Sequence, residues 1–170
     1  LYPADMVESL YRSYKNHPDC VSARRVHKMK FDSDGKILPY GSDWGWECKN
    51  ETEPSHLLFA TGVGGVLYPP HCMDGRIFEK ETMIANCLEN DDIWLKTMEI
   101  LKGTKVVWVA NTCMTPPIVE GSQQVGLCYT NVEKGGNDTQ IANMLRLYGK
   151  EIEERIGEFK KAYGGGTDVE

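Results

Sequence analysis

The chain has 170 residues, which is enough for one domain with a substantial hydrophobic core. Hydrophobic residues make up 41% of it, charged residues make up 26%, and no apolar run approaches the ~20 residues that span a bilayer. The net charge of −6 argues against nucleic acid or an anionic membrane surface as the main partner. No signal peptide is recognisable, so we expect a cytoplasmic protein.

The pattern at the start of the chain predicts a helix followed by a strand. Pro3 is typical of a helix start, and the apolar residues between Met6 and Tyr14 share one helical face. His17-Pro18 should end this helix, because the residue before a proline disfavours helical geometry. Residues 20–29 then predict a strand, interrupted by charged side chains.

A hairpin and a long loop follow. Asp34-Gly35 is a strong turn signal within residues 29–38, which predicts two short antiparallel strands. Residues 39–54 are polar and lack any period, and they include Trp44 and Trp46. We expect a loop here, and loops of this length are often functional.

A glycine-rich loop, Thr61–Gly65, lies between the apolar run at 57–59 and a short predicted strand at 66–67. Its glycines, Gly62, Gly64 and Gly65, lack the spacing of a dinucleotide fingerprint and are not followed by a helix. The chain also lacks the strand–turn–helix opening of a doubly wound nucleotide domain, so we exclude a Rossmann oxidoreductase.

The second half predicts three helices and a strand. Helices are expected over 79–88 and 91–102, with Gly103 in the usual C-terminal place, a buried strand over 105–109, and a last helix from about residue 139. The order of elements predicts an α/β fold, a mixed sheet with flanking helices. We expect one domain over 1–163 and a flexible tail over 164–170.

The six cysteines contain no CxxC pair, and their spacing matches neither a zinc site nor the disulfide framework of a short secreted chain. We therefore expect reduced thiols and assign no metal ligand in this chain. The cysteines are Cys20, Cys48, Cys72, Cys87, Cys113 and Cys128.

Asp91 and Asp92 open a predicted amphipathic helix downstream of the glycine-rich loop. Acids at a helix start suit general-base chemistry on a hydroxyl group. The alternative is that one of them only caps the helix. The spacing alone leaves both roles open.

Four segments, taken together and in this order, resemble bacterial glycosyltransferases. The similarity is to family 2-like enzymes of the GT-A fold, of the kind encoded in capsular polysaccharide and lipopolysaccharide clusters, and it extends to about residue 148. The segments are Leu1-Tyr2-Pro3-Ala4-Asp5, Thr61-Gly62-Val63-Gly64-Gly65-Val66-Leu67-Tyr68-Pro69-Pro70, Asn90-Asp91-Asp92-Ile93-Trp94-Leu95-Lys96 and Gly136-Asn137-Asp138.

The resemblance implies a nucleotide-sugar donor, a saccharide acceptor and a divalent metal, Mn²⁺ or Mg²⁺, held by an Asp-x-Asp motif. In the family this motif comes immediately before the segment that matches Leu1-Tyr2-Pro3. The chain therefore resembles the C-terminal, acceptor-binding half of such an enzyme. A sheet cut at this point should expose an edge, so we also expect self-association through that edge or the terminal helix.

The resemblance also implies roles for the matching residues. Asp92 corresponds to the general base of an inverting enzyme, and Asp91 would cap the helix or orient the acceptor. Gly62, Gly64 and Gly65 would line the sugar cleft, where a backbone without side chains lets a ring approach. Three tryptophans are further candidates for substrate contacts: Trp44, Trp46 and Trp94.

Several alternatives stay open at this point. The tryptophan rings in the loop either stack on a sugar or pack against the domain. Arg24, Arg25 and His27 are either solvated charges at a strand edge or include a residue that faces a diphosphate. The whole chain is either part of a glycosyltransferase, with peripheral membrane association through a lipid-linked acceptor, or a non-catalytic carbohydrate-binding or interaction module.

Overall fold

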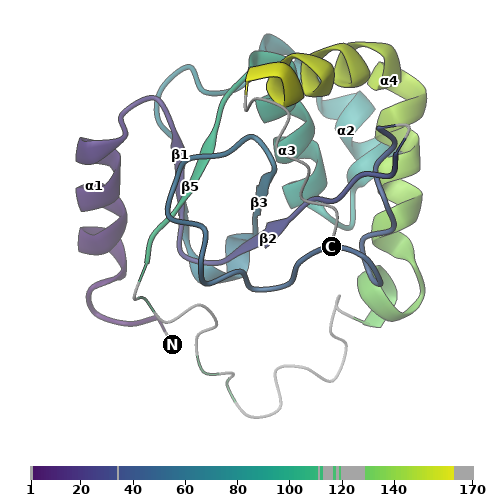
Figure 1. The fold of residues 1–170 in the computed structure, drawn as a ribbon. Coiled ribbons are helices and arrows are strands. Elements are labelled where there is room, and N and C mark those ends of the chain that lie inside the picture. Colours follow the sequence, from purple (N-terminus) through teal and green to yellow (C-terminus); the bar gives the residue numbers. More distant parts are fainter. Residues whose placement is uncertain are drawn as a thin grey trace.

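The computed structural model describes residues 2–33, 35–110, 112, 117, 119 and 129–162, with side chains as far as Glu158. It has a mixed α/β fold, which confirms the predicted fold class at this level. The strands lie between α1 on one side and helices α2, α3 and α4 on the other (Figure 1).

The first helix, α1 (Met6–Asn16), ends at His17 as the sequence predicts, and it leads into a three-stranded sheet. The strand order is β4-β1-β5, with β1 (Val21–Ala23) central. It pairs antiparallel with β4 (Val66–Leu67) and parallel with β5 (Val106–Trp108), so the sheet is mixed.

The single strand predicted over residues 20–29 is wrong, because the chain bends after β1. The bend carries it from the first sheet into a second, two-stranded one. There β2 (Val26–Lys28) pairs antiparallel with β3 (Leu58–Ala60). The bend falls at Arg24 and Arg25, where backbone bonds to residues far along the chain redirect the strand.

The predicted hairpin is present as an isolated antiparallel bridge between Phe31 and Ile37, but the two short strands expected on either side of the turn do not form. Gly35 adopts a left-handed φ of 85°, while Asp34 lies outside the described residues. Residues 39–54 contain no helix or strand, as expected, but Gly45 forms a bridge with Lys28 that ties this loop to the end of β2.

The helices follow the glycine-rich loop, in which Gly62–Gly64 form a short 3-10 helix. Another 3-10 helix, Gly75–Phe78, precedes α2 (Lys80–Cys87). The third helix, α3 (Asp91–Lys102), has the predicted bounds. A π-helical turn, Tyr129–Glu133, leads into the long helix α4 (Gly136–Ala162).

The helix α3 is the centre of the fold. Buried residues occur around its whole circumference, because it packs against the second sheet, α2 and α4. Its apolar side chains join one hydrophobic cluster with Phe59 of β3 and Met144 of α4, whereas β1, β2 and β5 contribute to a second cluster.

The described cysteines agree with the expectation of reduced thiols. Cys20, Cys48, Cys72 and Cys87 are free, and two of the six, Cys113 and Cys128, lie outside the described residues. The expected tail at 164–170 also lies outside them. Of the helices described, none combines the length and the apolar character needed to cross a bilayer.

Candidate functional site

The acidic start of α3 contacts the glycine-rich loop directly. The backbone N–H of Gly62 donates to both carboxylate oxygens of Asp92, at 3.1 Å to Oδ1 and 3.2 Å to Oδ2. A Cβ atom at Gly62 would lie 3.2 Å from Oδ1 of Asp92, a tight contact that the glycine avoids. Two motifs that are 30 residues apart in sequence therefore form one site.

The structure excludes the alternative that Asp91 or Asp92 is the N-cap of α3. The N-cap position of α3 is occupied by Asn90, whose side chain makes no capping hydrogen bond. Asp91 and Asp92 are the first two helical residues, where negative charge is favoured by the helix dipole. Asp91 is exposed, whereas Asp92 is half-buried and directs its carboxylate at the loop.

Asp92 ionises less readily than an ordinary aspartate. Burial raises its pKa from 3.8 to about 6, because a shielded carboxylate loses its hydration. The bond from Gly62 lowers this pKa, the charges of Asp91 and Glu99 raise it, and Arg25 lowers it. A carboxyl group with a pKa near neutrality can take a proton at neutral pH and release it again, as a general base must.

The glycine-rich loop is held in place by Arg25. Its guanidinium donates from Nη1 to Oγ1 of Thr61 at 3.0 Å and from Nε to Oε1 of Glu47 at 2.9 Å. The N–H of Thr61 donates in turn to the carbonyl of Arg25 at 3.1 Å. The sequence analysis did not single out Thr61 or Glu47, since no local pattern links positions so far apart.

A buried ion pair lies behind Asp92 on α3. Positions 92, 96 and 99 fall on one helical face. Lys96 and Glu99 are almost fully buried, and Nζ of Lys96 donates to Oε2 of Glu99 at 3.0 Å. Burial raises the pKa of Tyr68, and the charges of Glu99 and Asp92 raise it further, so its phenol stays protonated near the site.

The start of α4 is tied to the start of α3. The Nδ2 atom of Asn90 donates to Oδ1 of Asn137 at 2.7 Å, and Oδ1 of Asp138 accepts from the backbone N–H of Tyr40 at 2.7 Å. The segment Gly136-Asn137-Asp138 therefore fixes both the beginning of α3 and the loop that carries Trp44.

The other end of the glycine-rich loop packs against α1. Gly65 has a φ of +94°, and a Cβ there would lie 3.0 Å from Sδ of Met6. Its carbonyl accepts from the N–H of Arg24 at 3.2 Å. Gly65 thus serves the packing of α1, and Gly64 is buried; among the three glycines, Gly62 contacts the carboxylate of Asp92.

The tryptophans are placed differently from the expectation. Trp44 and Trp94 are 5% and 2% exposed, so neither has an open ring face, and the expected sugar contacts of these two residues are not available. Their indole nitrogens donate to backbone carbonyls, as is usual for buried tryptophans. Trp46 remains 41% exposed and lies 4.8 Å from the ring of His27.

His27 and Arg24 are also buried, which excludes for these two residues the alternative of solvated charges at a strand edge. Each is 1% exposed. Burial lowers the pKa of His27 to about 4, so its imidazole is neutral, and Nδ1 accepts from the N–H of Glu47 at 3.0 Å. His27 therefore supports the loop and carries no charge at neutral pH.

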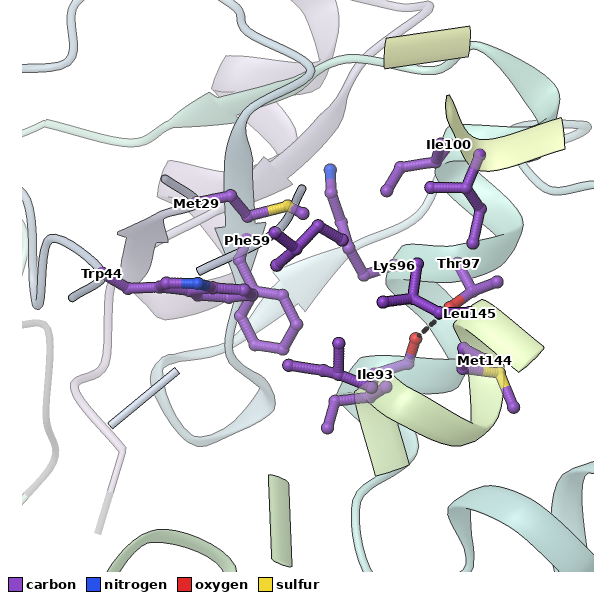
Figure 2. Close-up of a pocket in the computed structure, with 12 residues that line it drawn as sticks. Met29, Trp44, Phe59, Ile93, Lys96, Thr97, Ile100, Met144 and Leu145 are labelled. Atoms are coloured by element: carbon purple, nitrogen blue, oxygen red, sulfur yellow. Dashed lines mark hydrogen bonds between the residues drawn. The ribbon is translucent and has the colours of Figure 1, made fainter. Parts of the chain in front are cut away.

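An apolar cavity lies away from this site, between the second sheet and helices α3 and α4. Figure 2 shows Met29, Trp44 and Phe59 on one side of it and side chains of α3 and α4 on the other. Its volume of about 30 Å³ is far below that of a ligand pocket, and it contains no carboxylate. It is a gap in the core and not a substrate site.

The described part of the chain holds no group of three histidine, cysteine, aspartate or glutamate residues that could bind a metal ion. Comparison with protein-family models, curated proteins and solved structures finds no match. The chemistry of the site therefore has to be inferred from its own residues.

Proposed function

We propose that this chain is the acceptor-side part of an inverting glycosyltransferase of the GT-A type. It would transfer a sugar from a nucleotide-sugar donor to a saccharide acceptor, in the synthesis of a bacterial cell-surface polysaccharide. The divalent metal that the resemblance implies, Mn²⁺ or Mg²⁺, has no group of three candidate ligands among the described residues.

The observation that carries the proposal is the convergence of the four resembling segments. Gly62 binds Asp92, Asn90 binds Asn137, and Gly65 packs against Met6, directly after the first segment. The glycine-rich loop thus contacts both α1 and the start of α3, and the start of α3 contacts the start of α4. The raised pKa of Asp92 adds a second, independent mark of a functional site.

In the proposed reaction Asp92 is the general base, the role that the resemblance implies for it. Its ionised carboxylate removes the proton from an acceptor hydroxyl while that oxygen attacks the anomeric carbon of the donor. The bond between this carbon and the nucleoside diphosphate breaks, and its electron pair leaves with the diphosphate. One displacement inverts the anomeric configuration, and Asp92 then returns the proton to water.

The test is glycosyl transfer by a complete enzyme that contains this acceptor-side part, with nucleotide sugars as donors and saccharides as acceptors. We expect nucleoside diphosphate release and a product of inverted configuration by NMR. Asp92→Asn keeps the shape of the side chain but cannot take a proton, so kcat should fall roughly 10²–10⁴-fold. Asp91→Asn is the matched control and should stay within a few-fold of wild type, because Asp91 is exposed and Asp92 carries the hydrogen bonds to Gly62.

Two results would overturn the proposal. One is a complete wild-type enzyme that transfers no sugar from any donor tested. The other is an Asp92→Asn variant that keeps the wild-type kcat.

A further inference from the structure

Arg24 has an unusual environment for a charged side chain. It is 1% exposed, and its Nε and Nη1 atoms are buried without a hydrogen-bond partner. A guanidinium stays protonated in proteins, so burial cannot neutralise it. A buried charge with unsatisfied donors is strongly unfavourable, so this position favours a negatively charged group.

The protein itself supplies little compensation. The nearest carboxylate is that of Asp5, whose Oδ1 lies 3.6 Å from Nη1 and whose side chain is 63% exposed. This distance is too long for a good hydrogen bond, and water screens the charge of an exposed carboxylate. No other described residue forms an ion pair with Arg24.

Arg24 stands where α/β folds commonly bind ligands. It follows β1, whose neighbour β5 runs parallel to it, and Nε1 of Trp108 at the end of β5 donates to the carbonyl of Arg24 at 3.2 Å. The carboxyl ends of two parallel strands meet at this point, and ligands bind outside such ends. Figure 1 shows both strands ending on the same side of the molecule.

The glycine-rich loop connects Arg24 with Asp92. Gly62 contacts the carboxylate at one end of the loop, and Gly65 contacts the backbone of Arg24 at the other. The N–H of Gly65 donates to the carbonyl of Gly62 at 3.0 Å, so the two ends lie close together. The loop therefore joins the backbone of Arg24 to the carboxylate of Asp92, while the guanidinium of Arg24 lies beside Asp5.

We propose that Arg24 is the receptor for a phosphate group of the substrate. The unpaired Nε–H and Nη1–H bonds leave the guanidinium along different edges, so a planar carboxylate gripping one edge cannot satisfy both. A diphosphate carries oxygens in several directions and can accept from both edges. The source of this group, a nucleotide-sugar donor or a lipid-linked acceptor, rests on the proposed function.

The experiment is calorimetric titration of the full chain with inorganic pyrophosphate, which carries the anion without sugar, base or lipid. Arg24→Met should weaken this binding roughly 10- to 100-fold, because hydrogen bonds between charged groups are lost. Arg12→Met is the matched control and should bind like wild type, since Arg12 is an exposed residue of α1 paired with Glu8.

Thermal unfolding without ligand shows whether Arg24→Met folds, so that a loss of binding can be told from a loss of folding. Replacing an unpaired buried charge with an apolar side chain of similar length should leave the melting temperature of Arg24→Met equal or higher. Pyrophosphate should then raise the melting temperature of wild type and of Arg12→Met but not that of Arg24→Met. Wild type that does not bind pyrophosphate, or an Arg24→Met variant that binds it normally, would overturn the inference.

Two further titrations identify the source of the phosphate. Tighter binding of UDP or GDP than of pyrophosphate assigns the site to the donor, and tighter binding of a short-chain prenyl diphosphate assigns it to a lipid-linked acceptor. Pyrophosphate binding that depends on Arg24, without any sugar transfer, would support Arg24 as a phosphate receptor and reject the proposed glycosyltransferase function. Sugar transfer that depends on Asp92, with a donor KM that is unchanged in Arg24→Met, would support the glycosyltransferase and reject Arg24 as the phosphate receptor.

Discussion

The environment of Asp92 makes its negative charge unfavourable, which raises its pKa towards that of a general base. The same shift makes the free energy of unfolding depend on pH. Its pKa is about 6 in the folded protein against 3.8 ordinarily, so the folded state holds the proton more tightly than the unfolded state does. The resulting stabilisation is fully present below pH 3.8. It is lost as the pH rises through 6.

We therefore expect Asp92→Asn to be more stable than wild type at pH 7.5, by up to about 3 kcal/mol, with the difference vanishing near pH 4. Urea unfolding at a series of pH values measures this. Asp91→Asn, at an exposed position, should show a much smaller dependence. A difference between Asp92→Asn and wild type that stays constant from pH 4 to 7.5 would contradict the shifted pKa.

Single residues also mark the limit of what the sequence predicts. The resemblance assigned the glycine-rich loop and Asp92 to one sugar-transfer site, and the structure adds the direct contact between Gly62 and Asp92. The burial of Arg24 and Trp44 was not anticipated, because each lies in a polar stretch and is covered by residues distant in sequence. Burial depends on packing partners, and neither the charge nor the period of the local sequence reports them.

At the scale of elements, the starts of α3 and α4 are joined by the side chains of Asn90 and Asn137. Asn137 is 3% exposed, so Asn137→Ala would leave the amide of Asn90 without its acceptor. We expect a loss of roughly 1–2 kcal/mol in the free energy of unfolding, together with lower transferase activity because Asp92 is two residues from Asn90.

Chemical denaturation and the transfer assay test this coupling. Asn50→Ala, at an exposed position of the long loop, serves as the control and should change neither quantity. An Asn137→Ala variant with wild-type stability would show that the two helix starts are not coupled.

The elements that were predicted well are those with local signals. The bounds of α3 follow from its acidic first turn and from Gly103, whose φ of +83° and bonds to the carbonyls of Glu99 and Ile100 end the helix. The strand over residues 20–29 was predicted as one element because its composition is uniform. Its division at Arg24 is set by hydrogen bonds to Gly65 and Trp108, which no local pattern reveals.

At the scale of the whole molecule, the first sheet is small and mixed, and β4 pairs with β1 alone among the described strands. An unpaired strand edge is a template for pairing with another chain. We expect the mass measured by light scattering to rise with concentration above that of a monomer. A monodisperse monomer over a wide concentration range would contradict this expectation.

The parallel pairing of β1 with β5 also governs how the chain is made. Val21 pairs with Val106, so this sheet joins residues 85 positions apart, and such distant pairings form slowly. From Leu67 at the end of β4 to Val106 the ribosome adds 39 residues, which takes about 2–8 s at roughly 5–20 residues per second. For those seconds one edge of β1 is open on the nascent chain, so a second copy emerging nearby could pair with it before β5 is synthesised.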